Sequence, residues 1–177
     1  HHYIEIHEPA IRAVSRRYPD VIARGDIRAL AEQASQVAED LWSEARSQGA
    51  TAILFVAGFP CREPSRVNQH RRGLQAGETA RFVEAKGLYS ALIASQRPSD
   101  VELIAVWECV ASMTVEAATV VTKELQELDP RIEVTGIDTS GTSWRRRPRL
   151  WWTSFHIGKL EAEHEDRRHG RSEEHTS

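Results

Sequence analysis

Cysteine is scarce in this chain of 177 residues, in which only Cys61 and Cys109 occur. Two cysteines do not make a disulfide framework, so we expect an intracellular, reducing compartment. No apolar run approaches the roughly 20 residues of a membrane span, and no signal-peptide pattern opens the chain. The formal net charge of −3 excludes a protein coated in positive charge. A local basic patch would still suffice to bind nucleic acid.

The rest of the composition is that of an ordinary globular protein, with 40% hydrophobic and 28% charged residues. Apolar periodicity predicts strands that alternate with helices. The expected strands span 3–6, 21–23, 53–56, 101–107, 132–134 and 150–152, and the expected helices span 9–18, 29–48, 79–95 and 114–128. This alternation predicts an α/β fold with a doubly wound, mostly parallel sheet.

The two ends of the chain do not fit this pattern. Residues 159–177 are polar and lack hydrophobic periodicity, so we expect a disordered tail after one domain at 1–158. The last seven residues, RSEEHTS, resemble the translation of a sequencing adapter, and we leave them out of the fold argument. The chain begins inside an apparent strand, so we expect a domain truncated at both ends.

One stretch, Ile-Leu-Phe-Val-Ala-Gly-Phe-Pro-Cys at 53–61, organises the chain. Its apolar part reads as a buried strand, and Cys61 follows at the carboxyl end, where open α/β sheets place their ligands. Pro60 fixes its own backbone and stiffens the turn that holds the thiol. An arbitrary cysteine is more often inert and buried. Here a polar, basic loop follows, which favours a functional thiol.

The loop carries a family resemblance. The segments GFPCREPS at 58–65 and RRGLQAGE at 71–78 resemble the nucleophile loop of the DNA cytosine-5 methyltransferases, nearest the branch that includes the animal de novo enzymes. The resemblance covers roughly residues 2–155. It implies a Rossmann-like methyltransferase fold that transfers a methyl group from S-adenosylmethionine to carbon 5 of cytosine in DNA. It also implies that Cys61 attacks carbon 6, and a nuclear location if the source is eukaryotic.

A second block, Trp-Glu-Cys-Val at 107–110, resembles the Glu-Asn-Val block of the same family, with Cys109 in place of asparagine. The resemblance implies that Glu108 holds and protonates nitrogen 3 of cytosine. Glu108 could instead cap the helix expected from Thr114, but the five intervening residues disfavour this. The replacement of asparagine affects the hydrogen bonds that shape the nucleophile loop.

A third block, SWRRRPRLWW at 143–152, resembles the family's Gln-x-Arg-x-Arg block before a strand. Arg147 and Arg149 match the two arginines, and Arg145 stands where many members have glutamine. Alternate residues of a strand face the same way, so both matching arginines are expected to reach one pocket. Taken alone, the run also fits a solvated basic surface. With the other blocks, we predict that Cys61, Glu108, Arg147 and Arg149 are the catalytic residues.

Acidic residues follow the first two expected strands. Glu5 resembles the family's ribose-binding acid, and Gly-Asp-Ile at 25–27 resembles the segment that meets adenine. Alternatively, Glu5 is a solvated charge at a strand end and Glu8 is the ribose-binding acid. The segment 25–27 could instead be a simple turn. The predicted cofactor contacts are Glu5, Ile6, Asp26, Ile27 and Pro60. The family's glycine-rich turn would lie upstream, so we expect the 177-residue chain by itself to be inactive.

The basic loop predicts contacts with DNA phosphates at Ser65, Arg66, Arg71 and Arg72. The target cytosine must leave the duplex to reach the pocket. A transfer-RNA cytosine-5 methyltransferase and a catalytically inert regulatory paralogue remain alternatives, although retention of all four catalytic residues argues against the second. His1, His2 and His7 form at most an accidental cluster, and we predict no metal site.

Overall fold

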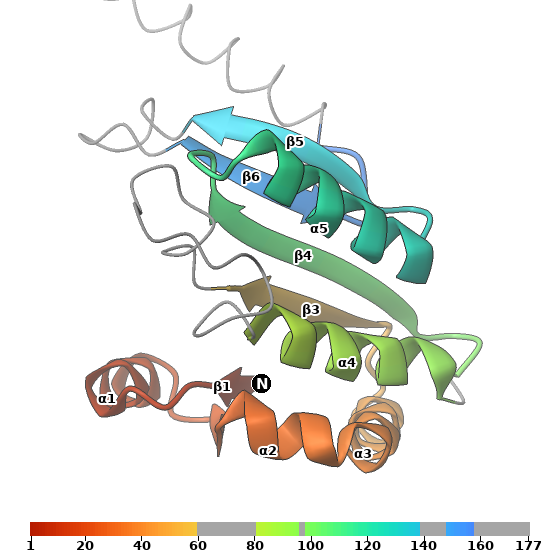
Figure 1. The fold of residues 1–177 in the computed structure, drawn as a ribbon. Helices are drawn as coiled ribbons and strands as arrows, with labels where there is room; N and C mark the ends of the chain where they lie inside the picture. The colour runs from red at the N-terminus through yellow and green to blue at the C-terminus, as the bar shows by residue number, and fades with distance from the viewer. Residues whose placement is uncertain (60–80, 96–97, 139–147, 158–177) are drawn as a thin grey trace, which may run out of the picture.

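The computed structural model describes residues 1–59, 81–95, 98–138 and 148–157, which form an α/β fold (Figure 1). The strands are β1 (His2–Ile4), β2 (Ile22–Gly25), β3 (Ala52–Gly58), β4 (Glu102–Val110), β5 (Glu133–Asp138) and β6 (Pro148–Thr153). The helices are α1 (Glu8–Arg17), α2 (Ile27–Glu32), α3 (Ala34–Ser47), α4 (Arg81–Ala94) and α5 (Val115–Leu128). None of the described helices is long and apolar enough to cross a membrane. The α/β class expected from the sequence is confirmed.

The larger sheet is mixed rather than mostly parallel. Its strand order is β3-β4-β6-β5, with β3 and β4 parallel and β6 antiparallel to both of its neighbours. A second sheet contains the parallel pair β1 and β2. The larger sheet departs from the expectation because β6 inserts between β4 and β5, which reverses the direction of pairing on both sides of it.

Helices α4 and α5 cover one face of the larger sheet (Figure 1). Trp107 and Trp152 are register partners on this face, and both are fully buried. Trp107 packs against Phe82 and Tyr89 of α4, with ring centroids 5.9 and 5.7 Å away. Trp152 donates from Nε1 to the Oγ1 atom of Thr122 in α5, at 2.8 Å. These tryptophans therefore fix both helices to the sheet.

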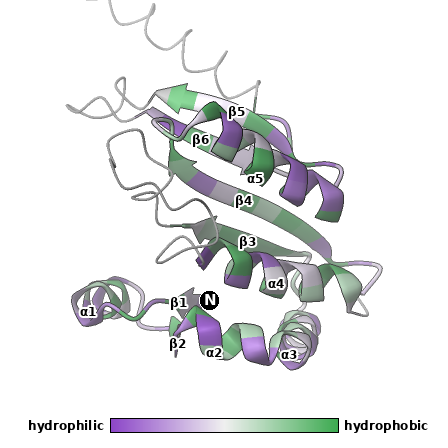
Figure 2. Ribbon diagram, viewed as in Figure 1, coloured by the Kyte–Doolittle hydropathy of each residue, from purple (hydrophilic) through white to green (hydrophobic). Residues whose placement is uncertain are grey.

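The opposite face of the sheet is apolar and less covered. Leu54 and Val56 of β3 are 61% and 63% exposed, and their register partners in β4 are the half-buried Ile104 and Val106. Figure 2 shows the hydrophobic colouring of these strands. Side chains alternate along a strand, so Glu108 lies on this same face, at its carboxyl end. The Glu108 carboxylate therefore lies at the end of the apolar row formed by Ile104 and Val106.

The amino-terminal sheet is tied to α3 through a histidine. His2 Nε2 lies 3.0 Å from the Glu44 carboxylate, and Arg24 Nε donates to His2 Nδ1 at 2.9 Å. Partial burial lowers the pKa of His2, against the opposing effect of Glu44. Because Nδ1 accepts from Arg24, the neutral ring donates from Nε2 to Glu44. His2 therefore has a structural role in the described part of the chain.

The helix expected over 29–48 is two helices that meet at Gln33. The N–H of Gln33 donates to carbonyls of the preceding turn, and its ψ of 28° turns the chain. This break lets both α2 and α3 pack against α4. On α3, Trp42 is buried and donates from Nε1 to the Leu92 carbonyl at 3.1 Å. Gly49, at φ +63°, ends α3 as expected.

Strand β4 continues three residues beyond its expected end at Trp107, so Glu108 lies within the strand. Helix α5 has its own cap, because the Thr114 side chain accepts from the Ala117 N–H at 3.2 Å. The alternative that Glu108 caps this helix is therefore wrong. The Glu108 side chain therefore lies on the face of the sheet opposite α4 and α5.

A polar cluster around the buried residues Asp129 and Tyr89 closes the opposite end of β4. Tyr89 donates to the Asp129 carboxylate at 2.7 Å, and Arg131 binds both oxygens of that carboxylate, at 3.0 and 2.9 Å. Arg131 also donates to the Leu103 carbonyl at 2.9 Å. Burial alone would raise the pKa of Asp129, but hydrogen bonds from Arg131 and Tyr89 lower it. The cluster joins α4, α5 and β4.

Candidate active site

Two of the predicted catalytic residues meet at the carboxyl end of β4. Arg149 Nε lies 2.5 Å from Glu108 Oε1, and the two side chains are 26% and 30% exposed. The pairing of β4 with β6 causes this contact, because Val110 is the register partner of Arg149 and Glu108 lies two residues before it, on the same face. The ion pair is partly shielded and still reachable from solvent.

The exit of β3 borders the same pair. Gly58 is the register partner of Glu108, and a Cβ atom built on Gly58 would lie 3.5 Å from Glu108 Oε2. Phe59 follows and is the last described residue before Pro60 and Cys61. The segment that contains the predicted nucleophile is thus covalently joined to a strand end beside Glu108.

Several predicted site residues lie outside the described residues. They are Pro60, Cys61, Ser65, Arg66, Arg71, Arg72 and Arg147. Their predicted roles as nucleophile, cofactor contact, phosphate contacts and second catalytic arginine therefore stay predictions. Of the four predicted catalytic residues, the structure brings together Glu108 and Arg149.

Arg149 has two partners among the described residues. In the structure its guanidinium binds Glu108 and also donates to the Pro148 carbonyl at 3.1 Å. Arg149 therefore orients the predicted acid.

Trp151 is a site neighbour that the sequence argument did not single out. It is the register partner of Glu108, and it lies two residues after Arg149 on the same face of β6. Its side chain is partly buried. Because Trp151 lies two residues after Arg149 in an expected strand, side-chain alternation could have placed it on the same face from the sequence. An aromatic surface thus flanks the ion pair.

The predicted ribose acid, Glu5, has a fixed carboxylate just after β1. Its Oε1 atom accepts from the backbone N–H groups of Ile6 and His7, at 2.8 and 2.9 Å. These bonds hold the side chain at the start of α1. A carboxylate fixed at the carboxyl end of a parallel strand fits a ribose hydroxyl donor. The neighbouring Ile6 is 63% exposed, so an apolar surface lies next to it.

The predicted adenine contact, Asp26, also serves as the N-cap of α2. Its Oδ1 atom accepts from the Arg28 N–H at 3.0 Å, and its Oδ2 atom binds the Arg28 guanidinium. The side-chain hydrogen bonds from Arg28, with the backbone bond, lower the pKa of Asp26 to about 2. Ile27 is the first residue of the helix. An adenine amino group would have to share this carboxylate with Arg28.

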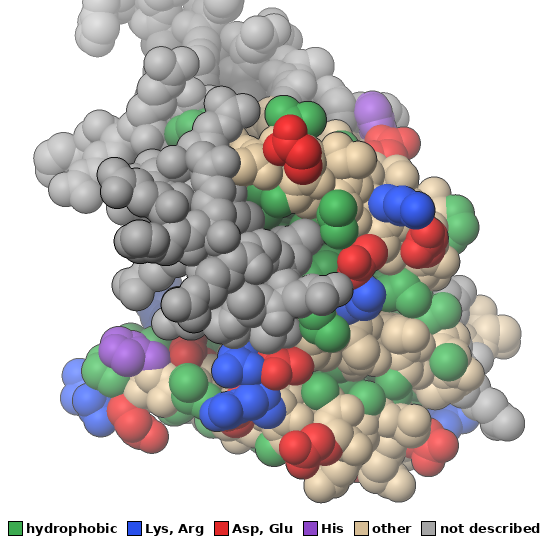
Figure 3. Space-filling view, viewed as in Figure 1, with side chains coloured by type: hydrophobic (Ala, Val, Ile, Leu, Met, Phe, Trp, Pro, Cys, Tyr) green, Lys and Arg blue, Asp and Glu red, His purple; other side chains and the backbone are tan. Residues whose placement is uncertain are grey.

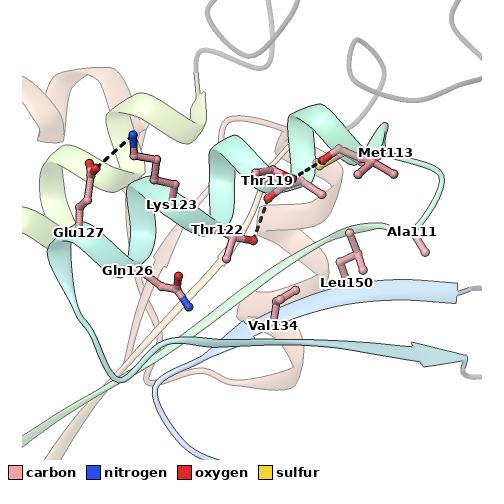
Figure 4. A pocket seen from close by; sticks show the side chains of 11 residues that line it. Ala111, Met113, Thr119, Thr122, Lys123, Gln126, Glu127, Val134 and Leu150 are labelled. Carbon is pink, nitrogen blue, oxygen red and sulfur yellow. Dashed lines mark hydrogen bonds and ion pairs between the residues drawn. The ribbon is translucent and has the colours of Figure 1, made fainter.

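A separate pocket of about 790 Å3 lies between α5 and the β5–β6 part of the sheet (Figure 4). Its walls include Met113, Thr119 and Lys123 around α5, and Val134 and Leu150 from the strands. Leu150 precedes Trp151 and so points to the opposite face from Glu108. None of the predicted site residues that the structure describes lines this pocket.

Charged side chains of both signs lie side by side on the face shown in Figure 3. Lys86 pairs with Glu124 at 2.6 Å, and Arg81 pairs with Glu84 at 2.5 Å. Within the described ranges, no group of three or more histidine, cysteine, aspartate or glutamate residues is arranged to hold a metal ion. These basic side chains are therefore already paired with acids.

Comparison with protein-family models gave no match, and comparison with curated proteins gave none either.

Proposed function

We propose that this chain carries the catalytic residues of a DNA cytosine-5 methyltransferase with a doubly wound, Rossmann-like fold. The observation that carries the proposal is the ion pair between Glu108 and Arg149, beside the exit of β3 that leads to Cys61. These residues come from three separate segments, and the family resemblance assigns all three to one pocket. The parallel pair β3 and β4 supports the fold, because ligands of such folds bind at carboxyl strand ends.

The proposed reaction begins with the Cys61 thiolate, which adds to carbon 6 of cytosine and leaves electron density in the ring. Glu108 binds nitrogen 3 and supplies a proton there, and Arg149 keeps its carboxylate oriented. Carbon 5 then takes a methyl group, a base removes the proton from carbon 5, and the thiolate leaves. S-adenosylmethionine, when bound, supplies the methyl group, with Glu5 as the acceptor for its ribose.

The test uses a fusion, called the extended protein, in which a strand and a glycine-rich turn like those of the family are added before His1. Duplex DNA that contains 5-fluorocytosine should trap this protein covalently, because fluorine at carbon 5 cannot leave as a proton does. Mass spectrometry should place the adduct on Cys61, and Cys61→Ser should give no adduct, since a hydroxyl is a weaker nucleophile at neutral pH. An adduct on Cys109 would contradict the proposal.

A parallel reaction with transfer RNA distinguishes a DNA methyltransferase from the main alternative, a transfer-RNA cytosine-5 methyltransferase. Methylation of transfer RNA without methylation of duplex DNA would show that the substrate is transfer RNA, and the proposed covalent mechanism would still hold. The absence of transfer to both, with S-adenosylmethionine binding intact, would favour a regulatory protein. Titration of the 177-residue chain with S-adenosylmethionine should show no binding in the micromolar range, and the extended protein should restore it.

A further inference from the structure

The pocket beside α5 has an apolar floor. Val134 of β5 and Leu150 of β6 line it from the sheet (Figure 4). Gly136 is the register partner of Leu150, and a Cβ atom built on this glycine would have Leu150 Cδ2, at 4.0 Å, as its nearest neighbour. The absence of a side chain at Gly136 therefore leaves space over the sheet. The volume of about 790 Å3 is sufficient for a small organic molecule.

The wall that α5 contributes to the pocket is polar. The hydroxyls of Thr119 and Thr122 each donate to the backbone carbonyl four residues earlier, at 2.8 Å. Gln126 donates from Nε2 to the Ile132 carbonyl at 2.9 Å. With these protons used, the Thr119 hydroxyl offers lone pairs, and the Gln126 amide retains its oxygen. This wall therefore offers mainly hydrogen-bond acceptors to a ligand.

The end of the pocket near the carboxyl terminus of α5 is electrically negative. Glu127 lines the pocket there, and the last turn of α5 contains no basic residue to offset the negative end of the helix. Beyond the helix, Arg131 binds Asp129. Lys123 is the one cation among the lining residues, and its Nζ atom lies 3.8 Å from Glu127 Oε1. Their side chains are 76% and 63% exposed, so this ion pair is weak and another cation can displace it.

We propose that this pocket binds a small organic cation. Its apolar body lies against Val134 and Leu150, and its N–H groups donate to Glu127 and to the acceptors on α5. The acceptors and the negative end of the helix favour an amine, amidinium or guanidinium over a carboxylate. The site is independent of the proposed methyltransferase site, because Leu150 and Glu108 lie on opposite faces of the sheet.

Benzamidine, benzamide and benzoate are matched probes, because they have similar shapes but carry a positive, a zero and a negative charge. Each is titrated into the 15N-labelled 177-residue chain, and the amide shifts measure binding. Benzamidine should shift the signals of Thr119, Gln126 and Val134 with a Kd of about 1 mM, as expected for so small a ligand. Benzamide should bind more weakly, and benzoate weakest of the three. Benzoate binding as tight as benzamidine binding, or no saturable shift with benzamidine, would overturn the proposal.

Thr119→Phe and Val120→Phe test the location of the site. The two residues are exposed neighbours on α5, but only Thr119 lines the pocket. The added ring of Thr119→Phe should fill the pocket and raise the Kd for benzamidine by about tenfold or more, which is a large change for so weak a ligand. Val120→Phe should leave the Kd unchanged. Equal affinities in the two variants would overturn the proposal.

Glu127→Gln and Lys123→Gln test the charge of the ligand. Glu127→Gln should weaken benzamidine binding by about two- to fivefold, because it removes an exposed charged partner. Lys123→Gln should strengthen binding, because it removes the competing cation. Each variant breaks the same ion pair, so a role of that pair in shaping the pocket would weaken binding in both. Weaker binding in both variants would therefore overturn the proposal.

Discussion

The two ends of β4 each lie against a carboxylate paired with an arginine. At the amino end, Asp129 is 5% exposed and accepts hydrogen bonds from Tyr89 and Arg131. At the carboxyl end, the Glu108 side chain is 30% exposed, and its one charged partner in the described part of the chain is Arg149. All acceptor positions of the Asp129 carboxylate are used within the protein, so it cannot bind a substrate. Glu108 keeps acceptor positions that a substrate could use.

The difference shows that residue types alone do not identify a site. Both pairs join an acid to an arginine, although Asp129 and Arg131 are two residues apart, whereas Glu108 and Arg149 come from different strands. What separates them is the number of partners and the access from solvent. Buried carboxylates that are fully hydrogen-bonded stabilise a fold, and partly exposed ones at a strand end are free to act on a ligand.

The largest expected effect concerns turnover in the extended protein. Glu108→Gln should lower the rate of methyl transfer about 100-fold or more, because a positioned acid typically contributes 10²–10⁴. Arg149→Ala should also lower the rate of methyl transfer, and Arg149→Lys should restore part of that rate. Single-turnover methyl transfer measures these rates. The matched change at the other end, Arg131→Ala, should leave the rate of the folded fraction within about threefold. A comparable loss at Arg131 would remove the distinction between the two ends.

The next effect is on stability, and here the Asp129 end of β4 should matter more than the Glu108 end. Asp129→Ala should lower the free energy of unfolding by about 2–4 kcal/mol, because the buried Tyr89 hydroxyl loses its acceptor and the partly exposed Arg131 loses its charged partner. Urea denaturation of the 177-residue chain measures this change. Tyr89→Phe removes one bond only and should cost about 1 kcal/mol. A cost below that of Tyr89→Phe would show that the carboxylate is not the centre of the cluster.

The stability that Asp129 contributes should depend on pH. Its pKa is lowered in the folded state, so this contribution is fully present above its unfolded pKa of about 3.9 and is lost as the pH falls through the folded value. The difference in unfolding free energy between the unchanged chain and Asp129→Asn should therefore shrink below about pH 4. Asp26, whose pKa is also lowered, must be replaced by asparagine in both proteins as a control. A difference that stays constant down to pH 2 would contradict the ionic role.

The smallest effect should come from the candidate site itself. Glu108→Gln should change the unfolding free energy by no more than about 1 kcal/mol, because partly exposed ion pairs contribute little. Urea denaturation in low and in high salt measures it, and the difference should decrease with salt. A loss as large as that of Asp129→Ala would mean that the Glu108–Arg149 pair is mainly structural.

The sequence predicted β3, β4 and α5 well, because their apolar patterns are strong and local. The resemblance assigned Glu108 and Arg149 to one catalytic site, but the ion pair between them was not predicted. It did not predict that β6 inserts between β4 and β5, since strand order depends on contacts between distant segments. The break at Gln33 was missed because the apolar face continues across it.

The Asp129 cluster was also invisible to the sequence argument. Tyr89 and Asp129 are 40 residues apart, and Asp129-Pro130 reads as a helix stop. The contact of Cys109 with the Phe59 carbonyl was missed for the same reason, since the two residues lie 50 apart in sequence, one in β4 and the other just after β3. Strand alternation predicts only that Cys109 points away from Glu108.

The four tryptophans that the structure describes give this chain two optical reporters. Trp42, Trp107 and Trp152 are at most 1% exposed, so their fluorescence should be emitted at short wavelength and should shift to the red only when the core opens. Trp151 lies beside Glu108 and is only partly buried. An aromatic base that stacks near Glu108 should quench Trp151 while the core signal stays unchanged. Replacing Trp151 by phenylalanine, in a chain in which Trp144 is also phenylalanine, would then separate the fluorescence of the site from that of the core.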